Sequence, residues 1–451
     1  MDDEIDNLIA QLQRVNSEEF DWSTESEFPN FVAVPGGQCH FSTQAQLSLT
    51  KIGRLIHGNR PVSEPRIESV ELVKMLRTVV ACAYAEGVLV RGDKASIRAG
   101  KRVLLERLED RIQKAAAPIT HVFPAWTTGL ERKAPVLLGP VKVLAVSDWL
   151  ETAEIYSGRD DGCMDPSWKQ AVQGLVPKPD DARASLLVDA VEESLGTCNA
   201  VVVVTIEGFE GEFSRKLAHI ASKNCLDILS LLHETPDTFV TQGLLEDRVQ
   251  PLETRTLSEI DGFLNIAGNR KLRPMLGGAR FAAVLERVSD LGSPISKVVK
   301  AVLTDPDVAQ PQLCARWSMA LHWFAEGCRE TDDAVAVAKI GASLDVLSGG
   351  GRRAGILKTV CCLLGADSRA IVTRWPEPKT LEKLVEEIYE YGRSQILHGN
   401  HVDRLKSFAE LRQVAQQLCG IALRISLERF GFYDGADDQK AFQSMMATPT
   451  L

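Results

Sequence analysis

Apolar residues recur at helical spacing through most of the segment from Pro306 to Phe430. Such stripes must be buried against another element, so this part of the chain is expected to fold as packed helices. The longest stripe lies between Leu405 and Ile425, and the glycine-rich run from Ser348 to Gly351 is a typical end for an earlier helix. Because short loops join the predicted helices, we expect a compact antiparallel bundle.

The strongest strand signal precedes this segment. Residues Ala200 to Ile206 form a β-branched run without polar alternation, which is typical of a strand buried on both faces. A turn from Glu207 to Gly211 and an amphipathic helix follow it, and apolar runs on either side of Gly139-Pro140 predict a hairpin. These patterns predict an α+β protein that is mostly helical, with a mixed α/β region before the C-terminal bundle.

The organisation of the chain follows from where these patterns change. Residues 1–60 combine a short acidic amphipathic stretch with loop-like sequence rich in Pro, Gly and Ser. They show no strong periodicity and are expected to be loosely structured, whereas helical spacing begins near Ile67. The predicted divisions are an N-terminal loop and helical segment (1–120), a small α/β region (121–245), a connecting region (246–305), the bundle (306–435) and a tail (436–451).

Composition limits the classes of function. The formal net charge of -10 disfavours nucleic-acid binding by the whole surface, so any RNA contact needs a local basic patch. The acidic N-terminus has no secretory signal, and no apolar stretch is long enough for a membrane-spanning helix, so we expect a cytoplasmic protein without membrane contact. The ten cysteines lack Cys-x-x-Cys spacing and are expected to be reduced core residues. Neither a metal nor a cofactor is expected, since the sequence shows no zinc-ligand spacing and no carboxylate cluster, and the neighbours Cys39 and His40 have no partner ligands.

The segment from Tyr391 to Asn400 carries the clearest chemical signal. It places Arg393 and His398 five positions apart, after a charged amphipathic helix, and should stop being helical at Gly399. Arginine is a permanent planar cation suited to phosphate oxygens, and histidine is the side chain whose ordinary pKa lies near neutral pH. The pair therefore suits phosphodiester chemistry. Its spacing alone is weak evidence, because roughly half a match of this kind is expected by chance in a chain of this length and composition.

The wording around the pair resembles the Arg-x4-6-His motif of the HEPN superfamily, and is most similar to its ApeA-like branch, in which Arg-Ser-x-x-x-His-Gly is usual. The segment around Asp345 resembles the second helix of that branch, although the family more often has Glu at this position. The resemblance covers residues 306–430 and implies a HEPN-type helical bundle.

The resemblance also implies a function. HEPN domains with an intact motif are commonly metal-independent endoribonucleases in which two protomers form one composite site, often in phage defence or abortive infection. Carried over, His398 would act as general base or acid and Arg393 would stabilise charge on the scissile phosphate of an RNA substrate. Ser394 would orient the phosphate, with Tyr391, Asn400 and His401 as further candidates. A homodimer is part of this expectation, and the N-terminal region would sense an unidentified trigger.

Other interpretations remain open. Arg393 would also suit a helix C-terminus as a plain cation, with His398 to Asn400 as a solvated cap. The bundle would then be a non-catalytic RNA-binding or dimerisation module. A third hypothesis is a nucleotide-handling enzyme centred on the strand at Ala200 and the turn at Glu207 to Gly211, which lacks the usual glycine motifs.

Two other Arg-His pairs have a spacing similar to that of Arg393 and His398, and several basic residues are candidates for a phosphate-binding rim. Arg316 and His322 fall within one predicted helix and are expected to be packing or solvated residues, and the shorter spacing of Arg54 and His57 is treated as coincidence. Basic residues after the glycine run and after the motif would form a phosphate-binding rim if both loops lie at the same end of the bundle. They are Arg352, Arg353, Lys358, Arg404, Lys406 and Arg412.

Overall fold

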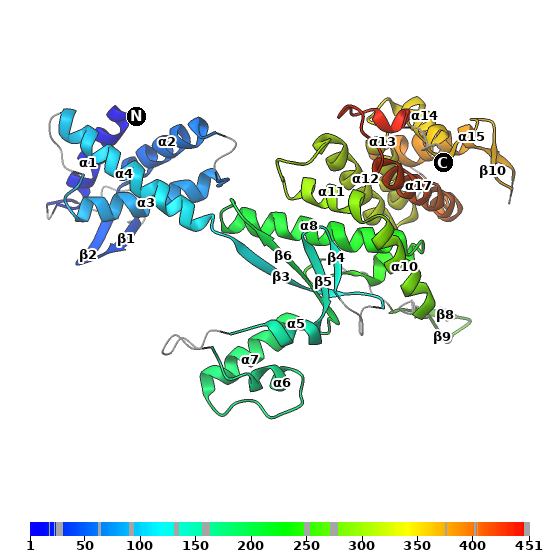
Figure 1. Ribbon diagram of the computed structural model, residues 1–451, viewed down its shortest axis with the longest axis horizontal. Helices are drawn as coiled ribbons and strands as arrows, with labels where there is room; N and C mark the ends of the chain where they lie inside the picture. Colours follow the sequence, from blue (N-terminus) through cyan, green and yellow to red (C-terminus); the bar gives the residue numbers. More distant parts are fainter. Residues whose placement is uncertain are drawn as a thin grey trace. The chain divides into compact units, whose positions relative to one another are not determined.

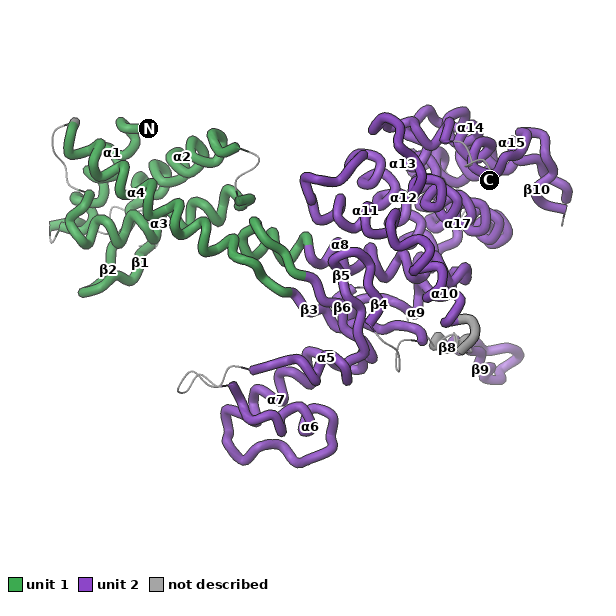
Figure 2. The backbone as a smooth tube through the Cα atoms, in the orientation of Figure 1, with its two compact units in different colours: residues 1–120, 205–217 green, residues 121–204, 218–451 purple. Residues whose placement is uncertain are grey.

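The computed structural model describes residues 1–17, 19–21, 23, 30–61, 65–89, 94–129, 135–155, 163–247, 253–270, 278–374, 377–400, 403 and 405–445. The chain forms two compact units, which Figure 2 draws in different colours. The first comprises residues 1–120 and 205–217, and the second comprises residues 121–204 and 218–451. The expected α+β class with a mostly helical chain is confirmed at this level.

The first unit consists of helices and a β-hairpin. The elements are α1 (Asp2–Val15), β1 (Asn30–Val34), β2 (Gly37–Phe41), α2 (Thr43–Asn59), α3 (Ser69–Ala85) and α4 (Lys94–Ala115). Strands β1 and β2 pair antiparallel, and the helices bury one apolar core. The expectation of a loosely structured segment over residues 1–60 is wrong. Helix α1 presents Ile5, Leu8, Ile9 and Leu12 at helical spacing, and all of them are buried in this core.

The second unit contains a five-stranded sheet of order β4-β5-β6-β3-β7. The strands are β3 (Ile119–Trp126), β4 (Val136–Leu138), β5 (Val141–Ala145), β6 (Ala200–Ile206) and β7 (Gly243–Leu244). The predicted hairpin across Gly139-Pro140 is confirmed, since β4 pairs antiparallel with β5. The predicted buried strand is β6, in which Ala200, Val201 and Val202 are fully buried although Thr205 is exposed. Helix α8 (Gly211–Leu232) follows it, as the pattern predicts.

A small helical insertion separates β5 from β6. It consists of α5 (Val146–Thr152), α6 (Ser167–Val172) and α7 (Ala182–Leu195). Its own apolar core centres on the fully buried Trp168, with Leu150 and Val188 against it. The insertion thereby buries its apolar side chains locally.

The expected connecting region contains regular elements. Its elements are the strands β8 (Glu253–Ile260) and β9 (Phe263–Arg270), which pair antiparallel, and the helices α10 (Gly278–Asp290) and α11 (Gly292–Val302). Short helix α9 (Asp237–Thr241) precedes them. Helix α11 packs against α12 and α17, so it belongs to the helical assembly that follows.

The predicted helices between residues 306 and 430 are present, and Figure 1 shows them gathered together. They are α12 (Pro311–Arg329), α13 (Asp333–Leu347), α14 (Arg352–Leu364), α15 (Leu381–Glu386), the π-helix η2 (Glu387–Ser394), α16 (Gln395–Leu397) and α17 (Ala409–Phe430), with strands β10 (Ile371–Thr373) and β11 (Lys379–Thr380) and the 3-10 helix η3 (Ala441–Gln443). Helix α13 packs against α12, α14, η2 and α17. The last helix begins at Ala409, and Leu405, expected in its stripe, is exposed. In the described part of the chain no helix is both long and apolar enough to cross a bilayer.

Trp317 fixes the contact between α12 and α17. Its side chain is fully buried, and its Nε1 donates to the carbonyl of Leu423 (3.1 Å) and to Ser426 Oγ (3.0 Å). A buried indole needs such an acceptor, because an unpaired polar group in the core costs free energy. The packing of α12 against α17 therefore depends on the hydrogen bonds of this indole as well as on buried apolar surface.

We predict that Trp317→Phe lowers the free energy of unfolding by about 2–3 kcal/mol, because it leaves a cavity and removes the indole donor. Urea unfolding followed by circular dichroism measures this change. Trp323→Phe is the matched control, since Trp323 lies on the same helix and is 36% exposed. Equal stability of the two variants would contradict the assigned role of Trp317.

Candidate functional site

The motif segment forms the C-terminal end of one continuous helical stretch. Arg393 lies in η2, and the stretch ends with α16 at Leu397. The backbone N–H of Gly399, which has φ +70°, donates to Ile396, and that of Asn400 donates to Gln395 (2.8 Å). The predicted end of the helix at Gly399 is confirmed. Residues 398–400 form a helix cap, as the alternative interpretation of the motif as a plain helix end requires. His401 and Arg404 lie outside the described residues.

Two glycines allow η2 to approach α13 closely. A Cβ on Gly392 would lie 2.3 Å from Val337 Cγ1, and a Cβ on Gly341 would lie 3.0 Å from Arg393 Cβ. Val337, Gly341 and Asp345 follow one another at four-residue intervals, so they share one face of α13. The contact therefore carries Arg393 to the part of that face where Asp345 lies.

Arg393 is held in place from two sides. Its Nη2 donates to Asp345 Oδ2 at 2.8 Å, and its guanidinium carbon lies 5.5 Å from the centre of the Tyr389 ring. The Arg393 side chain is 28% exposed. Two further buried atoms, Arg393 Nε and Asp345 Oδ1, have no hydrogen-bond partner in the described structure. Arg393 is thus a partly buried cation whose orientation is fixed by its contacts with Asp345 and Tyr389.

An open groove of about 890 Å³ joins the motif to the glycine run. Arg393, Ser394 and His398 line it, and His398 is exposed. The other lining residues are Asp345, Tyr389 and Glu390 on one side and Gly350, Gly351, Arg352, Arg353 and Ala354 on the other. The structure therefore brings together three of the motif residues selected from sequence, together with Arg352 and Arg353 of the predicted rim. Tyr389 and Glu390 were missed, because their position beside the motif carries no distinctive pattern.

Tyr391 and Asn400 are not among the residues that line the groove. The Tyr391 ring is 40% exposed, and Lys406 Nζ lies 5.0 Å from its centre. The side chain of Asn400 is exposed. Both residues are therefore neighbours of the groove, with no direct place in its wall.

The predicted basic rim is present in part. Arg352 and Arg353 line the groove, and Arg353 Nη1 lies 3.0 Å from Glu386 Oε1. Arg412 is occupied elsewhere, where it donates to Asp333 and to the carbonyls of Cys328 and Glu330. Lys358 is not among the lining residues. Among the described residues, the cations that line the groove are Arg352, Arg353 and Arg393, and the imidazole of His398 lies beside them.

The glycine run from Gly349 to Gly351 connects α13 to α14 and precedes Arg352. It packs against the C-terminal segment, residues 437–443. Gly349, Gly350 and Gly351 all have positive φ, which favours glycine. A Cβ on Gly349 would lie 2.1 Å from the carbonyl oxygen of Gln439. Close packing of the C-terminal segment therefore defines the course of the loop that forms one wall of the groove.

The similar Arg-His spacings have structural roles. Arg316 donates to the carbonyl of Val346 (3.1 Å) and to Gln439 Oε1 (2.8 Å), and burial lowers the pKa of His322. His57 lies near the end of α2 with Nε2 3.2 Å from the carbonyl oxygen of Ile67. The contacts of Arg316 and the burial of His322 agree with the expectation that these two are packing residues.

The turn after β6 offers little to a nucleotide phosphate. The carboxylate of Glu210 accepts hydrogen bonds from the backbone N–H groups of Glu212 (3.2 Å) and Phe213 (3.0 Å) at the start of α8. These amides are the donors that a phosphate would use at a helix N-terminus. An internal carboxylate thus occupies that position.

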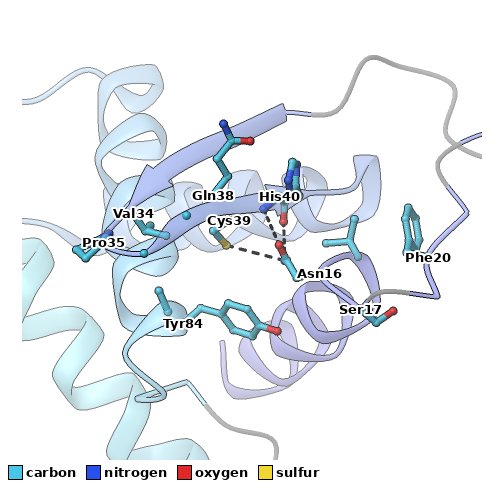
Figure 3. A pocket seen from close by; sticks show the side chains of 13 residues that line it. Asn16, Ser17, Phe20, Val34, Pro35, Gln38, Cys39, His40 and Tyr84 are labelled. Carbon is cyan, nitrogen blue, oxygen red and sulfur yellow. Dashed lines mark hydrogen bonds between the residues drawn. The ribbon is translucent and has the colours of Figure 1, made fainter.

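A second pocket, of about 590 Å³, lies in the first unit beside Cys39 and His40 (Figure 3). Asn16 fixes strand β2 there, since its amide donates to the carbonyl of His40 (3.0 Å) and accepts from the His40 N–H (2.8 Å). Burial raises the pKa of the Cys39 thiol to about 11, so the thiol is protonated at neutral pH. The ten cysteines are free, and five of them are buried; Cys163 is exposed.

Comparison of the chain with protein-family models, with curated proteins and with solved structures gives no match. The case for a function therefore depends on the groove and on the residues that line it.

We predict that Gly392→Ala destabilises the protein by about 1–3 kcal/mol, because the added methyl group would overlap Val337 and force η2 away from α13. Urea unfolding measures the change. Gly292→Ala is the control, since Gly292 is also helical and a Cβ there meets nothing within 4 Å. A Gly392 variant as stable as the wild type would show that the close approach is dispensable.

Proposed function

We propose that this protein is a metal-independent endoribonuclease of HEPN type that acts as a homodimer in phage defence. The observation that supports the proposal is the groove in which Arg393, Ser394 and His398 lie together with Arg352 and Arg353. An imidazole and several guanidinium groups in one open groove are suited to an RNA backbone, because arginine matches phosphate oxygens.

In the proposed reaction the ribose 2′-oxygen attacks the adjacent phosphorus and the bond to the 5′-oxygen breaks. An imidazole removes the proton of the 2′-hydroxyl, and a second imidazole protonates the leaving 5′-oxygen. The products are a 2′,3′-cyclic phosphate and a 5′-hydroxyl. His398 provides one of these groups in each protomer, and the second copy of the chain provides the other.

Arg393 stabilises the charge that develops on the phosphate. Its ion pair with Asp345 uses Nη2, so Nη1 remains a donor for a phosphate oxygen. Fixing the guanidinium before the substrate binds reduces the reorganisation required in the transition state. Asp345 is therefore a positioning residue in this proposal, and Ser394 contacts the same phosphate.

A second candidate is a non-catalytic HEPN-like bundle that binds RNA or mediates dimerisation, with the N-terminal unit as a sensor. The hydrogen bonds that place His398 in a helix cap favour this alternative, because a cap residue needs no catalytic role. The two candidates differ in whether RNA is cut or only bound.

We predict that the purified protein, with its trigger where one is required, cuts single-stranded RNA in the presence of EDTA and leaves 2′,3′-cyclic phosphate ends. His398→Ala should reduce the cleavage rate by roughly 100- to 10,000-fold, and Arg393→Ala by roughly 100- to 1,000-fold, without loss of the folded state. Gel analysis of labelled RNA and circular dichroism provide the two measurements.

His57→Ala is the matched control, since His57 precedes Gly58 and Asn59 just as His398 precedes Gly399 and Asn400. Its cleavage rate should be that of the wild type. Undiminished cleavage by the His398 variant would overturn the site assignment, and RNA binding without cleavage by the wild type would favour the second candidate.

A further inference from the structure

Strands β8 and β9 form a regular hairpin in the second unit (Figure 1). Their pairing is continuous from Glu253 with Arg270 to Ile260 with Phe263. Asp261 and Gly262, both with positive φ, form the two-residue turn, which is the favoured chemistry for a tight hairpin. The sequence thus specifies both the register and the direction of the ribbon.

This hairpin leaves its apolar side chains uncovered. All residues from 255 to 268 are exposed, and Phe263 is 78% and Leu257 68% exposed. Ile260, Leu264 and Ile266 are also more than half exposed. A two-stranded hairpin alone is marginally stable in water, and exposed apolar clusters of this kind mark interaction surfaces. The hairpin therefore needs a partner that adds strands or covers a face.

The outer edge of β8 is self-complementary. Strand residues alternate between faces, so Arg255, Leu257 and Glu259 lie on one face, and the two charges are equally distant from Leu257. If a second β8 pairs antiparallel around a two-fold axis at Leu257, each Arg255 faces Glu259 of the second copy. Opposite charges directly across a strand pair are stabilising. In any other antiparallel register of the two β8 strands, Arg255 no longer faces Glu259 of the second copy.

We propose that the β8 edge is the docking site for a second copy of this chain, with the two hairpins joined into a four-stranded antiparallel sheet. Leu257 pairs with Leu257 of the second copy, and Ile266, its cross-strand partner on β9, extends the apolar row on both sides. The sheet then has more than the two strands that are insufficient alone. The proposed function also requires two copies of the chain, and this inference goes beyond it by assigning their contact to the β8 edge, which is not part of the groove.

Charge reversal provides the test. The full-length chain should be a dimer by size-exclusion chromatography with light scattering, and sedimentation should give its Kd. Arg255→Glu or Glu259→Arg alone should raise the Kd about tenfold or more, because each creates two like-charge pairs in the dimer. The double reversal R255E/E259R restores both pairs and should return the Kd to near the wild-type value.

Arg369→Glu is the control for an exposed charge reversal elsewhere in the second unit, and it should leave the Kd unchanged. The proposed function is tested by RNA cleavage with His398→Ala, so its failure and the failure of this charge-reversal test are distinguishable. A monomeric wild type, including one that binds lipid vesicles through the hairpin, would overturn the proposal. So would a dimer that is insensitive to both single reversals.

Cross-linking tests the register. In a Cys163→Ser background, which removes the exposed cysteine, Leu257→Cys should form an intermolecular disulfide under mild oxidation. Ser258→Cys is the matched control, because position 258 of one copy faces position 256 of the other in this register. A disulfide at position 258 with none at position 257 would contradict the two-fold axis at Leu257.

Discussion

The close approach of α13 and η2 positions the groups on which a function of this bundle depends. Gly341 and Gly392 remove the side chains that would separate the two helices. The π-helical winding of η2 coincides with this contact, and such segments are frequent at functional sites. Because packed helices resist small displacements, the guanidinium of Arg393 acquires a fixed place beside Asp345.

The side chains that line the groove differ in how firmly their positions are fixed. Arg393 is partly buried and ion-paired, whereas His398 stands exposed after the last helical turn. Arg352 and Arg353 come from another segment, after the glycine run. The acidic neighbours Asp345 and Glu390 keep the groove from being uniformly positive. This mixture suits transient contact with a backbone phosphate better than tight binding of a polyanion, and it agrees with the negative net charge of the chain.

Sequence patterns predict the helices and strands whose buried residues recur at a regular spacing. They do not predict elements and contacts that depend on packing between distant segments. The helices α12, α13, α14 and α17 and the buried strand β6 follow from their apolar spacing. The amphipathic stretch that forms helix α1 is short and is followed by loop-like sequence, so residues 1–60 as a whole did not predict a packed unit although the apolar stripe of α1 is regular. The hairpin of β8 and β9 was missed because its apolar residues face no core of the chain. At the site, sequence selected Arg393, Ser394 and His398, but the contact with Tyr389 and the wall from Gly350 to Arg353 depend on packing between distant segments.

The C-terminal segment is structural, and its influence extends to the groove. Asp437 accepts hydrogen bonds from the backbone of Gln312 and Leu313 at the start of α12, and Gln443 donates to the carbonyl of Ser348. With the carbonyl of Gln439 against Gly349, this segment braces the loop that precedes Arg352. A truncation or fusion that displaces residues 437–443 would therefore release one wall of the groove, and it would also uncover Phe442, which is fully buried against Phe430 of α17. Residues 437–443 therefore support the loop that precedes Arg352, and cleavage among them would change the groove without touching Arg393 or His398.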